Sequence, residues 1–372
     1  MKILRILGTR GVPAAHGGFE TFAENLAQYL VAHGWRVVVY CQEDGADPVF
    51  EDTWQGVGRV HIPVVQTGPK GTIVFDWKAT AHAAQFGDLC LTLGYNTAMF
   101  CAMLRIKGIP NLINMDGIEW TRAKWGPVAK TWFWLNDWAG CWFGNHLVAD
   151  HPKIKEHLSS RVREDKVTMI PYGANEIRSA DKSLIIDFGI EPGRYGVLVA
   201  RAEPENTVLE IVRAFSRKSR NMRLAVLGNY DPNNNPYHRK VVDAASEEVI
   251  FLGAIYDKGI VEALRFYGRL YVHGHRVGGT NPSLVEAMGA GSAVLAHDNR
   301  FNRWVAGDGA HYFASEDECA SQLDKLLDDD AELERMRVAS RARFHEAFTW
   351  ENILGQYERL LTSTLPKTQH KR

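Results

Sequence analysis

Two glycine-rich segments of the sequence have residue types that could bind a phosphorylated ligand. The first runs from Gly8 to Thr21 and contains the pair Gly17 and Gly18, with Glu20 two residues later. Glycine lets the backbone approach a ligand closely, and unpaired N–H groups at the start of a helix favour an anion. A tight turn without a ligand explains the same glycines, and the segment matches neither the dinucleotide-binding motif nor the P-loop motif.

The second segment, His273–Gly289, is richer in such residues. Asn281 is placed to cap a helix that begins at Pro282. Free N–H groups near the start of that helix would face a diphosphate, and the carboxylate of Glu286 would accept hydrogen bonds from ribose hydroxyls. The alternative for Glu286 is an exposed helix residue. The donor-binding residues expected here are His275, Gly278, Gly279, Thr280, Asn281, Ser283, Leu284 and Glu286.

Arg201 lies just after an apolar run, Tyr195–Ala200, that predicts a strand. A guanidinium at this place could hold a diphosphate with two hydrogen bonds and stabilise charge that develops on a leaving group. An arginine taken singly is more often a member of a surface ion pair, so the interpretation depends on Arg201 sharing a sheet edge with the second glycine loop.

Alternating strand-like and helical patterns surround both glycine segments and predict two parallel sheets. The helix after the first loop has Phe19, Phe22, Leu26 and Leu30 on one face, although Thr21 and Glu24 also fit a capping box that would start it later. Other strands are expected at 2–7, 36–41, 61–65, 88–93, 111–115, 166–170, 222–227, 249–252, 270–273 and 293–297.

The sequence thus predicts an α/β protein of two doubly wound, Rossmann-like domains that face a cleft between them, since parallel sheets bind ligands at the carboxyl ends of their strands. The expected domains are 1–175 and 176–345, with a hinge in 174–194. Residues 346–372 are expected to form a C-terminal helix that packs back toward the N-terminal domain, followed by a basic tail from Lys367.

Composition excludes several classes of function. Lysine and arginine number 43 against 44 acidic residues, so the chain has no strong field to hold a nucleic acid. Five cysteines without regular spacing indicate reduced thiols, and no stretch has the apolar length of a membrane span. His273 and His275, with His297 or Asp298, could indicate a metal site, but no third ligand follows at a convincing interval. We therefore expect a cytoplasmic protein with no metal and no cofactor.

The quoted segments together resemble a known enzyme family. The G-G-x-E loop, the run from Arg201 to Glu205 and the run from Gly278 to Met288 resemble the retaining family-four glycosyltransferases of GT-B fold. Three longer runs, GTRGVPAAHGGFETF, MDGIEWTRAKW and HGHRVGGTNPSLVEAMGAG, resemble the bacterial rhamnosyltransferase branch that builds capsular polysaccharide and exopolysaccharide.

The chain departs from the family pattern at two positions. The family has two glutamates eight positions apart, of which Glu286 matches the second, whereas Gly278 stands at the first. A lysine that usually follows the arginine is replaced by Asn206, and Arg276 is a candidate for supplying its charge. The missing carboxylate fits a 6-deoxy sugar, and the branch implies dTDP-L-rhamnose as donor.

The resemblance implies transfer with retention of anomeric configuration, without a metal or a side-chain nucleophile. A leaving-phosphate oxygen takes the proton of the acceptor. The residues expected to take part in the chemistry are Arg201, Asp116 and Glu20, and the donor-binding residues further include Gly17, Gly18 and Asn206. Asp116 could orient a sugar hydroxyl, act as a base or only cap a turn.

Six tryptophans between Trp120 and Phe143 are interleaved with Arg122, Lys124 and Lys130. Such a mixture suits the surface of a membrane, where a lipid-linked saccharide acceptor would be found. A helix buried on the first sheet explains the same residues. We expect peripheral contact with the inner face of the cytoplasmic membrane, while a nucleotide-sugar epimerase and a non-catalytic nucleotide-sugar-binding protein remain as alternative functions.

Overall fold

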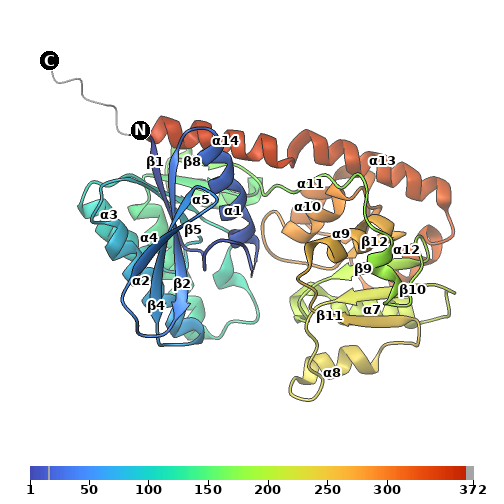
Figure 1. Ribbon diagram of the computed structural model, residues 1–372. Helices are drawn as coiled ribbons and strands as arrows, with labels where there is room; N and C mark the ends of the chain where they lie inside the picture. The colour runs from blue at the N-terminus through green and yellow to red at the C-terminus, as the bar shows by residue number, and fades with distance from the viewer. Residues whose placement is uncertain (16, 366–372) are drawn as a thin grey trace. The chain divides into compact units, whose positions relative to one another are not determined.

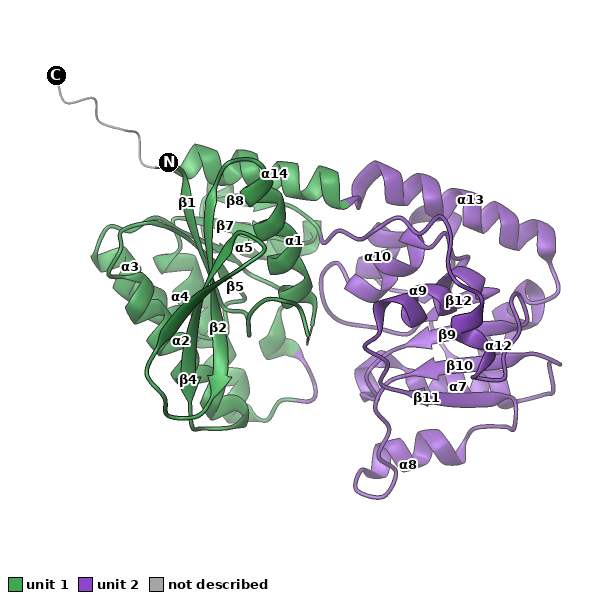
Figure 2. Ribbon diagram, in the orientation of Figure 1, with its two compact units in different colours: residues 1–121, 125–171, 350–372 green, residues 122–124, 172–349 purple. Residues whose placement is uncertain are grey.

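The computed structural model describes residues 1–15 and 17–365 and divides the chain into two compact units. Unit 1 contains Met1–Thr121, Trp125–Pro171 and the chain from Trp350 onward, whereas unit 2 contains Arg122–Lys124 and Tyr172–Thr349 (Figure 2). The basic tail expected from Lys367 lies outside the described residues.

Unit 1 is built on a sheet with the strand order β3-β4-β2-β1-β5-β6-β7-β8. Only the β3–β4 pair is antiparallel among the described strands. The strands are β1 (Ile3–Leu7), β2 (Arg36–Asp44), β3 (Phe50–Trp54), β4 (Val57–Val64), β5 (Leu89–Leu93), β6 (Asn111–Asn114), β7 (His146–Ala149) and β8 (Val167–Met169).

Helices cover both faces of this sheet, as its parallel strands require (Figure 1). The helices of unit 1 are α1 (Gly18–Ala32), α2 (Gly68–Ala83), α3 (Ala102–Ile106), α4 (Pro127–Phe143), α5 (Pro152–Ser159) and α14 (Trp350–Thr364). The last helix packs beside α1, where Phe22 contacts Trp350 and Tyr357 with ring centroids 6.3 Å and 4.7 Å apart.

Unit 2 has a second parallel sheet, ordered β11-β10-β9-β12-β13-β14. Its strands are β9 (Tyr195–Val199), β10 (Arg223–Leu227), β11 (Val249–Gly253), β12 (Leu270–His273), β13 (Val294–His297) and β14 (His311–Phe313). Its helices are α6 (Ser183–Ile186), α7 (Val208–Ser216), α8 (Pro236–Asp243), α9 (Lys258–Tyr267), α10 (Pro282–Gly289), α11 (Arg300–Ala306), α12 (Glu316–Leu326) and α13 (Asp330–Ala347).

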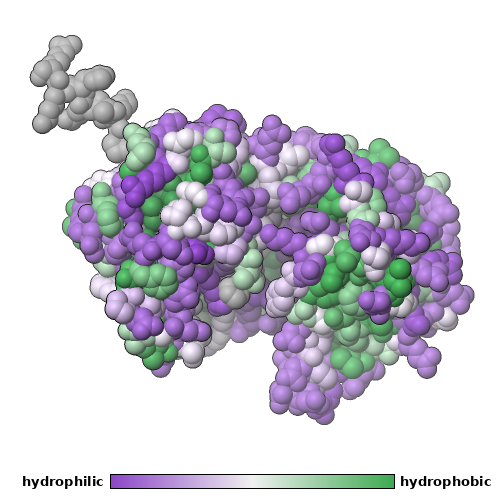
Figure 3. Space-filling model, viewed as in Figure 1, coloured by the Kyte–Doolittle hydropathy of each residue, from purple (hydrophilic) through white to green (hydrophobic). Residues whose placement is uncertain are grey.

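Each unit has its own core. Unit 2 has an apolar cluster on each face of its sheet, one around α7 and α12 and the other around α9 and α10. On the face drawn in Figure 3, hydrophobic residues gather over the part of unit 2 where β9 to β11 lie. The two doubly wound, Rossmann-like folds predicted from the sequence are confirmed. The described residues contain no helix whose length and apolar content would let it cross a membrane.

Candidate functional site

The first glycine segment forms the loop between β1 and α1. Gly8 and Gly11 have φ of 77° and 128°, and a side chain at Gly8 would lie 2.2 Å from the carbonyl oxygen of Leu93. The loop therefore needs glycine where it passes β5. Gly17 caps α1 and Gly18 is its first residue, so the capping box expected at Thr21 and Glu24 is wrong.

Two glutamates of α1 hold this loop. The carboxylate of Glu20 accepts a hydrogen bond from the Arg10 amide at 3.0 Å, and that of Glu24 accepts one from Ala14 at 2.5 Å. Glu20 is buried, and Glu24 is committed to the loop rather than to a capping box. Glu20, which the sequence places among the catalytic residues, thus orders the backbone around the glycines.

Asp116 follows β6 at the carboxyl edge of the unit 1 sheet, half-buried and with a left-handed φ of 53°. Its amide donates to the side-chain oxygen of Asn114 at 3.0 Å. Asn114 in turn donates to the hydroxyl of Tyr357 on α14 at 2.9 Å. A non-glycine residue in this conformation is uncommon and is typical of turns and functional sites, so the position of Asp116 is tightly defined.

In unit 2, the second glycine segment connects β12 to α10. Asn281 caps the helix and Pro282 is its first residue, as predicted. The amide of Ser283 donates to the Asn281 side chain at 3.0 Å, and the amide of Leu284 donates to the Asn281 carbonyl at 3.1 Å. The expectation that these two N–H groups are free is therefore wrong, because the cap has already satisfied them.

The N–H groups of Gly278 and Gly279, by contrast, donate no hydrogen bond within the described residues. Gly278 has φ of 125°, a conformation that side chains rarely adopt, and open space where a Cβ would be. A glutamate at this position would strain the backbone in this conformation. The free amides of the glycine pair are the better candidates for contacts with an anion.

Arg201 lies two residues beyond the end of β9, and β9 is the neighbour of β12 in the sheet. Its side chain is exposed, and its guanidinium forms no ion pair with any described residue. The carbonyl of Arg201 accepts a hydrogen bond from the side chain of Asn206 at 2.9 Å. Asn206, which is buried, therefore shapes the loop that carries Arg201 and uses its amide nitrogen for that purpose.

The Arg201 loop and the second glycine segment are packed backbone to backbone. Thr207, with φ of 47°, donates from its hydroxyl to the carbonyl of Gly274. A side chain at Gly274 would lie 2.1 Å from the Asn206 carbonyl oxygen, and the amide of Arg276 donates to the Glu205 carbonyl at 3.0 Å. The structure thus brings the two predicted donor-binding loops of unit 2 together.

The rings of His273, the last residue of β12, and His275, two residues later, are stacked, with ring centroids 4.5 Å apart and planes at 14°. His273 is fully buried and His275 is half-buried. Burial, together with the charges of Arg201 and Arg122, lowers the pKa of His275 to about 3. His275 is therefore neutral at pH 7 and can donate a hydrogen bond without adding charge.

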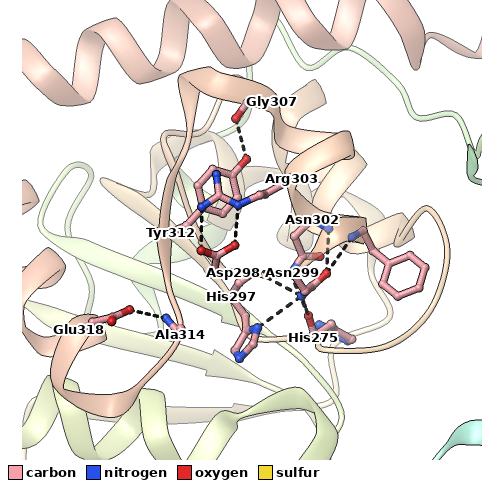
Figure 4. A network of polar contacts seen from close by, with 11 residues as sticks. His275, His297, Asp298, Asn299, Asn302, Arg303, Gly307, Tyr312, Ala314 and Glu318 are labelled. Atoms are coloured by element: carbon pink, nitrogen blue, oxygen red, sulfur yellow. Dashed lines mark hydrogen bonds and ion pairs between the residues drawn. The ribbon is translucent and has the colours of Figure 1, made fainter. Parts of the chain in front are cut away.

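The carbonyl of His275 is anchored by α11 (Figure 4). The side-chain amides of Asn299 and Asn302 donate to it at 3.0 Å and 2.8 Å, while the Asn299 oxygen caps α11. These asparagines did not emerge from the sequence, although Asn299 has the local signal of a helix cap. The described residues contain no cluster of three or more residues that could hold a metal.

Glu286 lies one turn into α10 with its side chain 33% exposed. Its Oε2 atom forms an ion pair with the guanidinium of Arg265 at 2.7 Å, a partner that the sequence does not indicate. Arg276, the candidate for the charge of the missing lysine, lies 3.6 Å from Glu210 and is 46% exposed. Part of its charge is thus already compensated within unit 2.

Two family models match the chain. Residues 1–175 match a model described as a domain of unknown function (DUF1972), and residues 207–359 match one described as glycosyl transferase-like. No curated protein sequence matches the chain.

Several solved structures share the fold of the whole chain. Sucrose-phosphate synthase from Thermosynechococcus elongatus is 18% identical with a TM-score of 0.79, over 98% of this chain and 99% of that one. Anabaena HepE in complex with UDP is 16% identical with a TM-score of 0.75, over 98% and 100% of the two chains. A trehalose-phosphate synthase from Burkholderia xenovorans, solved with glucose-6-phosphate, is 13% identical with a TM-score of 0.74, over 97% and 100%. These likenesses confirm the GT-B fold.

Proposed function

We propose that this chain is a glycosyltransferase that takes a sugar from a nucleotide-diphosphate donor bound by unit 2. The observation that carries the proposal is the packing of the Arg201 loop against the Gly278–Gly279 loop at the carboxyl ends of β9 and β12. An unpaired guanidinium and free glycine amides at one place suit a diphosphate. The glycosyl transferase-like match of residues 207–359 and the UDP bound by HepE support it.

The groups of this site have distinct roles in the proposed reaction. Arg201 stabilises the charge that develops on the departing diphosphate, the neutral ring of His275 donates a hydrogen bond to the donor, and Glu286 accepts from ribose. The bond from the anomeric carbon to the phosphate oxygen breaks while a bond to the acceptor oxygen forms on the same face. Attack on the face from which the phosphate departs retains the anomeric configuration, and the acceptor proton passes to the leaving phosphate, so the reaction needs neither a side-chain base nor a metal.

In unit 1 we assign Asp116 to a sugar hydroxyl of the acceptor and Glu20 to the positioning of the Gly17–Gly18 loop. Asp116 is held at a sheet edge by Asn114, and Glu20 accepts from the loop backbone. The donor proposed on the resemblance is dTDP-L-rhamnose, and the acceptor is a lipid-linked saccharide in the synthesis of capsular polysaccharide or exopolysaccharide. The glycine at 278 supports a donor sugar unlike glucose, since it provides no carboxylate there.

Donor binding is tested by Arg201→Ala and Glu286→Ala. Each removes a charge-assisted hydrogen bond of roughly 1.5–3 kcal/mol, so affinity for the nucleoside diphosphate should fall by about tenfold or more. Arg217→Ala is a matched control, because Arg217 pairs with Glu316 and Asp317 at the surface and has no place in the site. Titration calorimetry with dTDP and UDP measures the effect, and unchanged affinity in both site variants would falsify the assignment of the donor to unit 2.

A panel of nucleoside diphosphates in a thermal-shift assay identifies the base, because a ligand that binds only the native state raises its melting temperature. Incubation with dTDP-L-rhamnose and a lipid-diphosphate saccharide then tests the reaction. A transferase releases dTDP only when the acceptor is present. An epimerase changes the donor sugar without any acceptor, and a binding protein shifts its melting temperature without turnover.

The membrane contact is proposed on the outer face of α4. Trp120, Trp125 and Trp132 direct their ring nitrogens to Asp137, Glu119 and the Asn96 carbonyl. The opposite face forms an apolar stripe, in which Trp134, Trp138 and Trp142 have neighbouring rings at 6.3 Å and 5.7 Å. The exposed members of the stripe are Val128, Trp134, Leu135 and Trp142, and Trp142 is 60% exposed.

Basic groups flank this α4 stripe. The guanidinium of Arg161, which also pairs with Asp137 at 2.7 Å, lies 4.5 Å from the ring centroid of Trp138, and Lys166 donates to the Cys141 carbonyl at 2.7 Å. Aromatic side chains next to cations suit anionic lipid headgroups. The double variant Trp134→Ser/Trp142→Ser should lose most binding to anionic liposomes in a sedimentation assay, whereas Tyr256→Ser, which removes an exposed aromatic ring from unit 2, should not. Equal sedimentation of the two would contradict the proposal.

A further inference from the structure

Arg265 is a buried cation in the last turn of α9, with its side chain only 6% exposed. Its Nη2 atom forms an ion pair with Oε2 of Glu286 on α10 at 2.7 Å. Burying an arginine is unfavourable unless a carboxylate compensates its charge. The pair therefore fixes the position of the Glu286 carboxylate relative to α9 and the sheet.

The carboxylate of Glu286 has a second oxygen, Oε1, which accepts no hydrogen bond from any described residue. The side chain is one-third exposed, so this oxygen can be reached from outside. Oε2 of Glu286 is thus paired with Arg265, and Oε1 is left to accept a hydrogen bond from a ligand.

A contribution to stability does not by itself explain why Arg265 is buried at this place. Its Nε atom has no hydrogen-bond partner, and the same is true of the hydroxyl of Tyr271 and both ring nitrogens of His273, all of them buried in this part of unit 2. Leaving each such group unpaired inside the protein is unfavourable. A buried ion pair is also often replaceable by apolar residues without loss of stability. Unpaired polar groups gathered at one place are more typical of a binding site than of a core.

We propose that Arg265 is a positioning residue for the nucleotide: it orients Glu286 so that Oε1 accepts a hydrogen bond from a pentose hydroxyl of a nucleoside diphosphate, which in dTDP is the 3′-hydroxyl. The inference rests on the proposed function, which assigns the donor to unit 2. It adds that recognition of the ribose depends on a side chain from α9 that itself does not touch the ligand.

The test compares a nucleoside diphosphate with an analogue that lacks the pentose hydroxyls: dTDP with 3′-deoxy-dTDP, and UDP with 2′,3′-dideoxy-UDP. The wild type should bind the hydroxyl-bearing nucleotide about tenfold more tightly, and Arg265→Met should reduce that preference to less than about twofold. Arg265→Lys should restore part of it, because a cation remains. In the double variant with Glu286→Gln, Arg265→Met should have no further effect on the preference, since the arginine acts through Glu286.

Arg220→Met is the matched control for general damage to unit 2. Arg220 is equally buried, at 4% exposure, and pairs with Asp324. It should lower the melting temperature and leave the ribose preference unchanged. If Arg265→Met does not fold, Arg265→Lys and Glu286→Gln still measure the preference in folded protein.

The outcomes separate the inference from the function on which it rests. If the wild type binds no nucleoside diphosphate, the proposed function fails. If it binds one without preferring the ribose hydroxyls, or if the Arg265 variants keep the full preference, the positioning role is overturned while the donor site stands. An effect of Arg265→Met that adds to that of Glu286→Gln also overturns it.

Discussion

Asp76 on α2 is a partly buried acidic side chain, and the hydroxyl of Thr97 donates to it at 2.8 Å. Burial raises its pKa from 3.8 to about 6, and the hydrogen bond from Thr97 opposes this increase. The native state therefore binds the proton more tightly than the unfolded state does. Stability is unaffected below about pH 4, falls as the pH rises toward 6, and stays reduced above that.

Asp76→Asn should remove this pH dependence. Because one pKa unit corresponds to about 1.4 kcal/mol and Asp76 is partly exposed, we expect roughly 1–3 kcal/mol of stabilisation at pH 8. No such gain is expected at pH 3, where the carboxyl is largely protonated in both states. Urea unfolding at the two pH values measures the difference, and an equal gain at both would contradict the explanation.

Sequence patterns that involve only neighbouring residues predicted some of the site residues correctly. Asn281 and Pro282 start α10 as expected, because a helix cap depends only on its immediate neighbours. The capping box at Thr21 and Glu24 failed since Glu24 binds the loop before the helix instead. Arg265 gives no sequence signal at all, because its pairing with Glu286 exists only when two helices have packed.

The elements that position the donor loops approach each other more closely than any side chain would allow. Gly274→Ala would place a methyl group 2.1 Å from the Asn206 carbonyl oxygen, which is backbone and cannot rotate away. We expect a loss of about 1–3 kcal/mol in stability, and weaker binding of the nucleoside diphosphate because the Arg201 loop must shift.

Gly126→Ala is the control for this substitution, since no atom lies within 4 Å of the added methyl. Thermal unfolding and calorimetry of both variants measure the two effects. If Gly274→Ala had normal stability and normal affinity, the close packing of the Gly274 backbone against the Arg201 loop would not be needed for folding or for binding.

At the scale of elements, the strands with strong apolar runs were predicted and the weaker ones were missed. β3 escaped because its residues, FEDTW, are mostly exposed on an edge and pair antiparallel with β4. β7 is only four residues long and follows directly on the apolar helix α4, so its own pattern is hidden. β14 has just three residues, too few for periodicity. Sheet pairing, a tertiary property, decides such short segments.

Across the whole chain, the last helix completes the first unit. Tyr357 of α14 is buried against Phe22, and its hydroxyl accepts from Asn114 near Asp116. Tyr357→Ala should therefore destabilise unit 1 by about 3–5 kcal/mol, whereas Tyr357→Phe should cost only about 1 kcal/mol through the lost hydrogen bond.

Scanning calorimetry with and without an added nucleoside diphosphate measures these changes. The transition of unit 1 should shift to lower temperature in Tyr357→Ala, and the transition that responds to nucleotide should stay in place. A shift of the nucleotide-sensitive transition alone would contradict the prediction that Tyr357 stabilises unit 1.

The chain order has a consequence for synthesis on the ribosome. All of unit 2 from Tyr172 is made between the body of unit 1 and its final helix. At roughly 5–20 residues per second, the nascent first unit waits on the order of 10–40 s for α14. During that interval the surface of α1 that later meets Trp350 and Tyr357 is bare, which makes the half-finished polypeptide a natural client for chaperones.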